Sequence, residues 1–186
     1  GNGSSVTAIK NNKSIDTSMG LTPLPGLIMG TRCGDLDPGI ITFLAENEKL
    51  SFKEIDTLLN KKSGFLGVSG VSDMRELHDK STSGDASAKL TIDMLCYQLA
   101  KYIGSYYAIV GSLDAIAFTG GIGERAFYVR AKVCSYLKHF GVELDASSNN
   151  KNAEKISSKK SKVNVLVISA NEELMIARHA RNVMKK

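Results

Sequence analysis

Cysteine and histidine are scarce in this 186-residue chain, which has three of each. The cysteines, Cys33, Cys96 and Cys134, lie far apart and form no Cys-x-x-Cys pair. Neither a disulfide framework nor a zinc site with the usual ligand spacing is therefore indicated. The histidines are equally scattered, so spacing alone assembles no Ser/His/Asp or Cys/His catalytic group.

Long apolar runs are also missing. No stretch approaches the roughly 20 apolar residues that span a bilayer, and the first residues lack the pattern of a secretory signal. Hydrophobic residues make up 42% of the chain and charged residues 23%, which is ordinary for a globular protein. We therefore expect a cytoplasmic protein with one main core and no membrane contact.

The net charge is +5 and its excess is local. The segment 149–162 contains five of the lysines, at positions 151, 155, 159, 160 and 162. Because it has no aromatic side chain for base stacking, we expect a solvated loop here. Nucleic-acid binding through this loop is the weaker alternative, and it predicts an affinity that falls steeply with salt.

Hydrophobic periodicity and turn residues predict the order of the elements. The expected elements are two strands joined at "KNNKS", a helix from a Ser51/Glu54 capping box to Gly64, a helix over 85–109, a strand at 114–120, a loop at "GIGE", a helix over 125–140, a strand at 163–169 and a helix from Asn171 to about Met184. Alternation of strand and helix in the last third predicts parallel pairing. The apolar stripe on the 85–109 helix runs from Leu90 to Tyr106 and predicts a core face or a subunit interface.

Three motifs are candidates for chemistry. "FTGGIGER" (118–125) places glycines between a strand and a helix, which suits either a nucleotide phosphate or close helix–strand packing. In "MGTRCGDLDP" (29–38), Arg32 suits phosphate or carboxylate contact, or else a salt bridge to Asp35 or Asp37. In "ISANEEL" (168–174), Glu172 follows a strand end, where carboxylates hold Mg²⁺, although favourable placement on the helix dipole explains it equally. The pattern favours phosphoryl transfer.

The chain closely resembles the acetate kinase family in "GNGSSVTAIKNNKSIDTSMGLTPLPGLIMGTRCGDLDPGI", "FTGGIGER" and "VLVISANEELMIAR", in order and over almost its whole length. The family belongs to the sugar kinase/Hsp70/actin superfamily. The resemblance implies an α/β fold, a ribonuclease H-like (actin-like ATPase) domain with a mixed sheet flanked by helices and its first strand missing. It also implies that residues 1–186 are the C-terminal nucleotide-binding domain, without the N-terminal catalytic domain.

The family transfers a phosphoryl group reversibly between ATP and acetate, giving ADP and acetyl phosphate. The resemblance implies that Arg32 stabilises the transferring group and that Glu172 helps to bind Mg²⁺ or Mn²⁺. It further implies three nucleotide-binding segments: Gly1, Asn2 and Gly3 in a phosphate-binding turn, Asp73, Met74 and Arg75 against the nucleoside, and Gly121, Ile122, Gly123, Glu124 and Arg125 in an adenosine loop.

Two positions depart from the family pattern, which usually has Asn in place of Arg125 and Ser in place of Cys33. Since the upstream domain supplies the family's catalytic aspartate and substrate-binding arginine, we expect residues 1–186 alone to have little kinase activity. Family members are homodimers, so the 85–109 stripe is a candidate interface. Propionate kinase shares these motifs and stays open. A dinucleotide-binding oxidoreductase is less favoured, since Glu143 has nearly the required spacing but ends no obvious strand.

Overall fold

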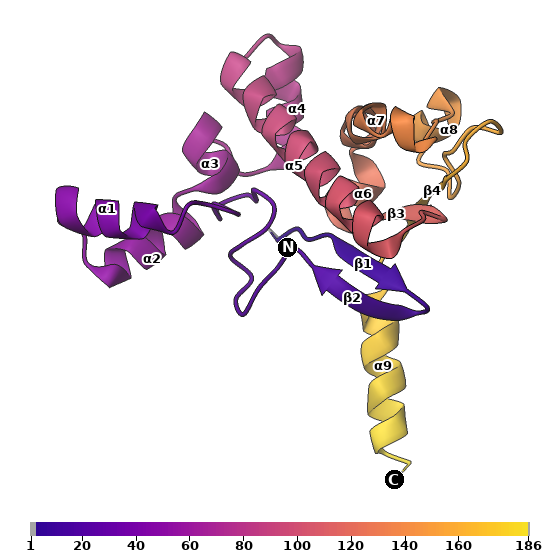
Figure 1. The fold of residues 1–186 in the computed structure, drawn as a ribbon, viewed down its shortest axis with the longest axis horizontal. Helices are drawn as coiled ribbons and strands as arrows, with labels where there is room; N and C mark the ends of the chain where they lie inside the picture. The colour runs from indigo at the N-terminus through magenta and orange to yellow at the C-terminus, as the bar shows by residue number, and fades with distance from the viewer. Residues whose placement is uncertain (1–2, 186) are drawn as a thin grey trace. The chain divides into compact units, whose positions relative to one another are not determined.

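The computed structural model describes residues 3–185, and the chain divides into two compact units, Gly1–Leu113 and Asp114–Lys186 (Figure 1). Each unit combines helices with one two-stranded sheet, antiparallel in the first unit and parallel in the second. This mixture of helices and small sheets confirms the predicted α/β class. Gly1 and Asn2 of the expected phosphate-binding turn lie outside the described residues.

The first unit opens with the predicted hairpin. Strand β1 (Thr7–Lys10) pairs antiparallel with β2 (Lys13–Thr17). Asn11 and Asn12 connect the strands with φ values of 52° and 58°. These left-handed values are what a type I′ turn needs, and asparagine tolerates them better than most residues. The turn chemistry of "KNNKS" was therefore sufficient to predict this element.

Five helices follow in the first unit: α1 (Gly39–Asn47), α2 (Phe52–Lys61), α3 (Gly64–Ser69), α4 (Met74–Thr82) and α5 (Ala86–Val110). The predicted capping box begins α2, since the Ser51 hydroxyl accepts from the Glu54 N–H and the Glu54 carboxylate accepts from the Ser51 N–H. The predicted end of this helix at Gly64 is wrong. The helix ends at Lys61, and Gly64 instead begins α3 with a φ of 66°.

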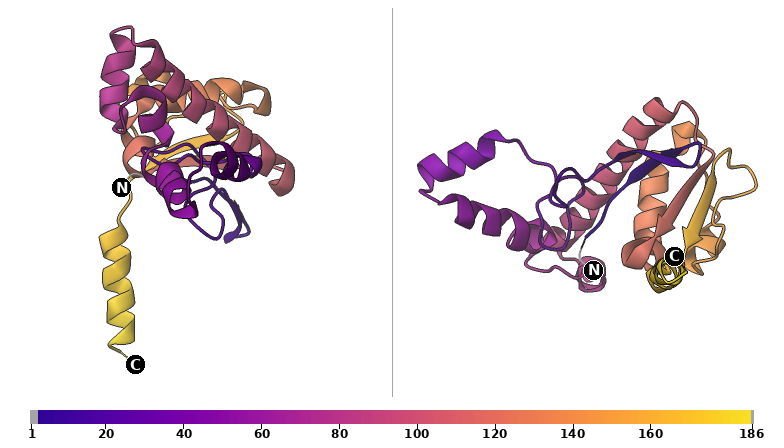
Figure 2. Two further views of the ribbon diagram at one scale, coloured as in Figure 1. Left: turned by 90° about the vertical axis from the view of Figure 1, so that its left-hand side faces the viewer. Right: turned by 90° about the horizontal axis from the view of Figure 1, so that it is seen from below.

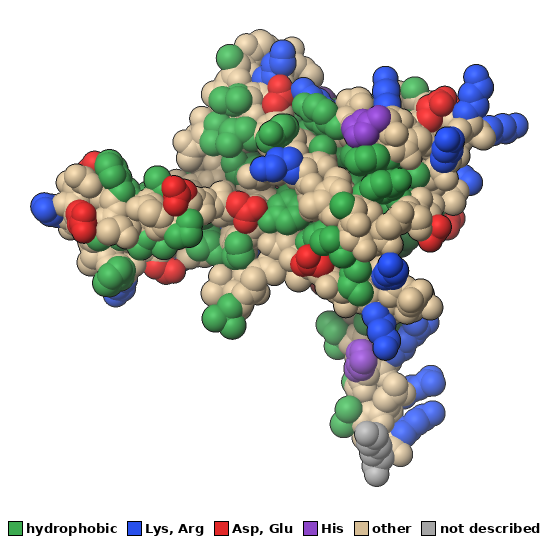
Figure 3. Space-filling model, in the orientation of Figure 1, with side chains coloured by type: hydrophobic (Ala, Val, Ile, Leu, Met, Phe, Trp, Pro, Cys, Tyr) green, Lys and Arg blue, Asp and Glu red, His purple; other side chains and the backbone are tan. Residues whose placement is uncertain are grey.

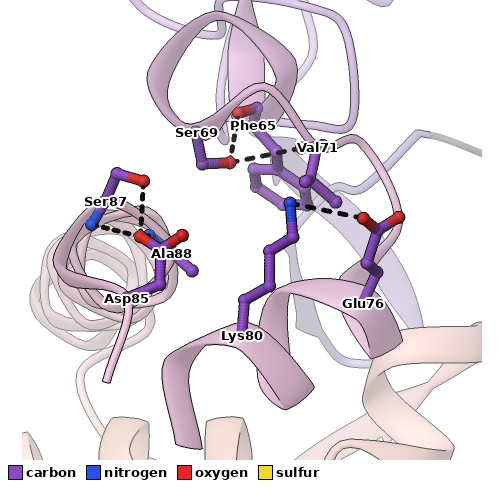
Figure 4. Close-up of polar contacts among 8 residues, drawn as sticks. All are labelled: Phe65, Ser69, Val71, Glu76, Lys80, Asp85, Ser87 and Ala88. Carbon is purple, nitrogen blue, oxygen red and sulfur yellow. Dashed lines mark hydrogen bonds and ion pairs between the residues drawn. The ribbon is translucent and has the colours of Figure 1, made fainter. Parts of the chain in front are cut away.

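Side chains hold the backbone at the ends of α3 and α5 (Figure 4). The Asp85 carboxylate accepts hydrogen bonds from the N–H groups of Ser87 and Ala88, at 2.8 and 3.1 Å, and so caps the start of α5. At the end of α3 the Ser69 hydroxyl donates to the carbonyl of Phe65 over 2.9 Å. The Asp85 contacts fix where α5 begins, and the Ser69 contact holds the last turn of α3.

Helix α5 presents the predicted apolar face. Its buried residues recur at three- and four-residue spacing along 25 residues: Ala88, Thr91, Ile92, Leu95, Cys96, Ile103 and Tyr106. Leu90 of the predicted stripe is not part of this buried face, because it is 54% exposed. Leu90 lies two positions before Ile92, and two helical steps place a side chain on the opposite side of the helix.

The second unit is built on the parallel pair β3 (Ala115–Thr119) and β4 (Asn164–Ile168), which lie side by side in Figures 1 and 2. Its helices are α6 (Gly120–Arg125), α7 (Phe127–Tyr136), the 3₁₀ helix η1 (Lys138–Phe140), α8 (Ala146–Asn150) and α9 (Glu172–Val183). The parallel pairing confirms the prediction. The expected loop at "GIGE" is wrong, because these residues form α6 directly after β3, where the Glu124 carboxylate accepts from the Gly120 N–H.

The core of the second unit packs α7 and the chain around η1 with the two strands. Its buried apolar side chains include Phe118, Val129, Val133, Leu137, Val142, Ile156, Val165 and Val167. Val129, Val133 and Leu137 thus face inward, as the helical spacing predicted. Burial of this set holds the carboxyl ends of β3 and β4, and hence the start of α6, in one place.

Helix α9 begins with the predicted cap, in which the Asn171 side chain accepts from the Leu174 N–H. None of its side chains is buried, and Figure 3 shows hydrophobic and basic side chains together along it. None of the helices within residues 3–185 is both long enough and apolar enough to cross a membrane.

Candidate phosphate and nucleotide sites

Arg32 lies in a closed loop of the first unit, the arginine loop (residues 26–35). The two ends of the loop are joined, because the Asp35 N–H donates to the Gly26 carbonyl over 2.9 Å and the Gly26 N–H donates to Asp35 Oδ1 over 2.8 Å. Cys33 donates its S–H to the Gly34 carbonyl over 3.1 Å, a bond that the family's serine could also make. The pKa of the Cys33 thiol is raised, and burial is the largest cause.

The middle of the arginine loop is fastened to the α2–α3 segment (residues 59–65), which runs from the end of α2 to the start of α3. The Ser63 N–H donates to the Thr31 carbonyl over 3.1 Å, and the Phe65 N–H donates to the Met29 carbonyl over 2.8 Å. The Cys33 N–H in turn donates to the Leu59 carbonyl over 3.0 Å. The backbone on both sides of Arg32 is therefore held by hydrogen bonds.

The Arg32 guanidinium itself is lightly engaged. Its Nη1 donates to the Pro23 carbonyl at 3.3 Å and lies 3.6 Å from Met29 Sδ. It makes no ion pair with any carboxylate of residues 3–185, so the salt bridge to Asp35 or Asp37 weighed from the sequence is not formed. A Cβ added at Gly3 would lie 3.1 Å from Nη1, so the structure brings Gly3 and Arg32 together.

Asp73 and Arg75 form a two-pronged ion pair at the start of α4. Asp73 caps the helix by accepting from the Arg75 N–H, and its two oxygens lie 3.1 Å from Arg75 Nε and 2.7 Å from Nη2. The hydrogen bond from the Arg75 side chain is the largest cause that lowers the pKa of Asp73. Both side chains are open to solvent, whereas Met74 between them is buried in the core.

Helix α6 carries the expected adenosine loop in the second unit. A Cβ added at Gly123 would lie 3.1 Å from the carbonyl carbon of Phe118, so Gly123 is required for close helix–strand packing. Gly121 is exposed and a Cβ there would meet nothing within 4 Å. The Glu124 carboxylate is already used, because its Oε1 accepts from the N–H groups of Gly120 and Ala170 at 3.1 and 2.9 Å. It ties together the ends of β3 and β4.

An open cavity of about 500 Å³ adjoins this helix. It is lined by Glu124 and Arg125 of α6, by the end of β4 and by the chain after α8, with Asn152, Glu154, Val167, Ile168 and Ser169 as its other members. Arg125 is exposed at its edge. The cavity lies at the carboxyl ends of parallel strands, where ligands of α/β sheets gather.

Arg130 supports this helix, although no motif in the sequence pointed to it. Its side chain is fully buried, and all five of its N–H donors are used on neutral oxygens. Nη1 donates to the carbonyls of Gly123 and Glu124 at 2.8 and 3.0 Å, Nε and Nη2 donate to Asn149, and Nη2 also donates to Asn152 Oδ1. Burial lowers the pKa of Arg130. Its position between the inward-facing Val129 and Val133 was the one signal in the sequence that Arg130 is buried.

Glu172 lies in the first turn of α9, directly after β4. Its carboxylate is exposed and has no hydrogen-bond or ion-pair partner among residues 3–185, so its oxygens are free to act as ligands. Mg²⁺ retains several waters and typically takes one or two protein carboxylates together with substrate phosphates. Glu172 fits that pattern, while no cluster of three potential metal ligands occurs among the described residues.

Comparison with known proteins identifies the family. The sequence model of the family described as the acetokinase family matches residues 1–178. The chain is 54% identical to the acetate kinase of Lawsonia intracellularis over 96% of its own length and 45% of that protein's.

Solved structures agree. The propionate kinase of Francisella tularensis matches 95% of this chain and 46% of its own with a TM-score of 0.92 and 48% identity. The acetate kinase of Porphyromonas gingivalis matches 98% of this chain and 47% of its own with a TM-score of 0.93 and 45% identity. The chain thus spans about half the length of these relatives.

The matches confirm the expected fold and do not favour the oxidoreductase alternative, whose acidic residue Glu143 lies outside β3 and β4. The closed arginine loop, the glycine-containing helix α6 and the matches along the sequence lead to one conclusion: the chain belongs to the acetokinase family.

Proposed function

We propose that this chain supplies the nucleotide side of an acetate kinase and is its C-terminal nucleotide-binding domain. Arg32 is the observation that carries the proposal. Its backbone is fixed by hydrogen bonds on both sides, yet its guanidinium makes no ion pair with a carboxylate of residues 3–185. A cation on a fixed backbone, with no carboxylate partner in the described part of the chain, is suited to the charge that develops on a transferring phosphoryl group.

The reaction is a direct in-line transfer. A carboxylate oxygen of acetate forms a bond to the γ-phosphorus of ATP while the bond to the β–γ bridging oxygen breaks, which gives acetyl phosphate and ADP. Arg32 offsets the charge on the equatorial oxygens, and backbone N–H groups of the Gly1-Asn2-Gly3 turn bind phosphate oxygens. The proximity of Gly3 to Arg32 Nη1 supports these two roles.

Two further segments bind the nucleoside in this proposal. Asp73 and Arg75 offer exposed polar groups held in a fixed pair, and the buried Met74 contributes through its backbone. Gly121 to Arg125 form the second segment, in which the bare surface of Gly121 allows a ring to approach the backbone. Ile122 and Gly123 shape this surface, and Glu124 holds it to the strand ends.

Glu172 is the protein group that would hold Mg²⁺, or Mn²⁺ in its place, directly or through water. When bound, the ion supplies positive charge that neutralises the phosphate oxygens of ATP. Glu172→Ala is expected to raise the Mg²⁺ concentration that half-maximal activity requires. A wild-type Mg²⁺ titration curve would argue against this role.

The whole protein is proposed to be a cytoplasmic homodimer. The three cysteines of this chain form no disulfide with one another, which suits a reducing compartment. Large apolar side chains of α5, namely Leu90, Tyr97 and Ile109, are more than half exposed and are candidates for a subunit interface. Size-exclusion chromatography with light scattering on the full-length protein tests this assembly.

Two measurements test the proposed function. Calorimetric titration of the chain with Mg²⁺–ADP and with NADH should show binding of ADP alone. A coupled assay on the full-length protein should show phosphorylation of acetate, whereas the isolated chain should show little turnover because the upstream domain is missing. Absence of both ADP binding and acetate phosphorylation would contradict the proposal.

Propionate kinase is the second candidate, because a solved propionate kinase is 48% identical to this chain. The two activities differ by one methylene in the acyl substrate, a difference that a pocket can distinguish by about 1–3 kcal/mol. Comparing kcat/KM for acetate and propionate on the full-length protein decides between them. A ratio that favours propionate would replace acetate kinase with propionate kinase.

A further inference from the structure

Two side chains of helix α5 form hydrogen bonds with the arginine loop. Gln98 Oε1 accepts from the Ile28 N–H at 2.6 Å. One turn further along the helix, the Tyr102 hydroxyl donates to Asp35 Oδ2 at 2.6 Å. Gln98 and Tyr102 are four residues apart and therefore lie on one face of α5. This face holds both the first and the last part of the loop.

Asp35 links Tyr102 to the closure of the loop. Its Oδ2 accepts from Tyr102 while its Oδ1 accepts from the Gly26 N–H at 2.8 Å. Burial, followed by the hydrogen bond to Asp35, raises the pKa of Tyr102, so the phenol stays protonated and remains a donor at neutral pH. The carboxylate is therefore fixed between a backbone amide of the loop and a side chain of a 25-residue helix.

We propose that Gln98 and Tyr102 are positioning residues that set the place of Arg32 through the arginine loop. The inference rests on the proposed role of Arg32 in phosphoryl transfer. Ile28, Arg32 and Asp35 are parts of one short closed segment, so a displacement at either anchor moves the backbone that carries the guanidinium. A displacement of the order of 1 Å can cost about 100-fold in rate.

The position of the contacts explains why two anchors are needed. Backbone bonds from the α2–α3 segment hold Met29, Thr31 and Cys33, which fixes one side of the loop. Gln98 and Tyr102 hold Ile28 and Asp35, which lie just outside that central stretch. The loop is therefore held by α5 and by the α2–α3 segment, whereas the Arg32 guanidinium has polar contacts only with the Pro23 carbonyl and Met29 Sδ among residues 3–185.

Tyrosine variants of the full-length protein test the Tyr102 anchor. Tyr102→Phe removes the hydroxyl and is expected to lower kcat about tenfold while KM for ATP stays within twofold. Tyr106→Phe is the matched control, since Tyr106 lies one turn away, is buried, and its hydroxyl has no hydrogen-bond partner among residues 3–185. This control should leave kcat unchanged. Equal loss of kcat in both variants would overturn the proposal.

Glutamine variants test the second anchor. Gln98→Glu keeps an oxygen that can accept from the Ile28 N–H and should retain most of the wild-type kcat. Gln98→Leu removes the acceptor and should lower kcat by about the same factor as Tyr102→Phe. Circular dichroism and a thermal melt confirm that each variant is folded at the assay temperature. A Gln98→Leu enzyme with wild-type kcat would overturn the role of Gln98.

A double-mutant cycle separates positioning from general stability. Once Arg32→Ala has removed the guanidinium, Tyr102→Phe should lower kcat no further, although it should lower Tm equally in both backgrounds. The same tenfold loss of kcat in the Arg32→Ala background would show that Tyr102 acts independently of Arg32 and would overturn the proposal. Failure of the proposed function looks different, because Arg32→Ala alone would then leave kcat unchanged.

Discussion

Gly64 lies so close to the backbone of Arg32 that no side chain fits between them. A Cβ at Gly64 would lie 2.6 Å from the Arg32 carbonyl oxygen and 2.9 Å from its nitrogen, and it would also clash with the Met29 carbonyl oxygen. Its φ of 66° is a second restriction, because L side chains are strained at this value. The start of α3 can therefore support the arginine loop only with glycine at this position.

Gly64→Ala should lower both the stability of the fold and the activity of the full-length protein. Gly70→Ala is a matched control, because Gly70 has a φ of 74° but nothing within 4 Å of an added Cβ. The backbone strain of about 1–2 kcal/mol is common to both substitutions. Urea unfolding should show a larger loss for Gly64→Ala, and only this variant should lose kcat. Equal effects at the two sites would contradict the close contact.

Arg130→Met should destabilise the second unit strongly. The substitution leaves carbonyl and amide oxygens of Gly123, Glu124, Asn149 and Asn152 without their donors, and each buried acceptor left unpaired costs about 1–3 kcal/mol. We expect a loss of at least about 3 kcal/mol in the free energy of unfolding, measured by urea denaturation. Arg178→Met, at an exposed position of α9, should leave it unchanged.

Stability should depend on pH through the helix cap at Asp85. Hydrogen bonding, with that to Ser87 as its largest cause, lowers the pKa of Asp85 in the folded state. The ionised cap therefore contributes stability above the unfolded pKa of about 4, and this contribution is lost as the pH falls through the folded value. Asp85→Asn keeps a capping oxygen that does not titrate. Its Tm should lie below that of the wild type at pH 7, and the gap should narrow as the pH falls below about 4 and close below the folded pKa of Asp85.

Arg75→Ala should weaken nucleotide binding without weakening the fold. The Asp73–Arg75 pair is exposed, and exposed ion pairs contribute little to stability. We expect a several-fold increase in Kd for ADP, measured by calorimetry, with an unchanged Tm. Lys80→Ala breaks the exposed Glu76–Lys80 pair on the same helix and should change neither quantity. An unchanged Kd in the Arg75→Ala protein would remove Arg75 from the proposed site.

Local signals were enough to predict the elements that depend on local chemistry. The Asn11–Asn12 turn, the Ser51–Glu54 capping box and the Asn171 cap are each formed by residues within a few positions of one another. The parallel pair β3–β4 was predicted because a helix between two apolar strands leaves little choice of topology. These features needed no knowledge of distant contacts.

Contacts between distant residues could not be predicted in this way. The role of Gly64 depends on Arg32, 32 positions earlier, and the bond between Tyr102 and Asp35 joins residues 67 positions apart. Asn149 and Asn152, 19 and 22 positions after Arg130, accept three of its five hydrogen bonds, and no local pattern indicates these partners. The pattern pointed to Arg32 as a phosphate ligand, but the residues that hold it became visible only in the fold.

The kcat of Arg32→Ala in the full-length protein tests the central claim most directly. In a coupled acetate-phosphorylation assay, the substitution should lower kcat by at least about 100-fold, because a charge that acts on the transferring group is lost. The Kd for ADP should change far less, and Arg32→Lys should recover only part of the rate, since an ammonium lacks the planar pair of donors. An Arg32→Ala enzyme with the kcat of the wild type would contradict the account.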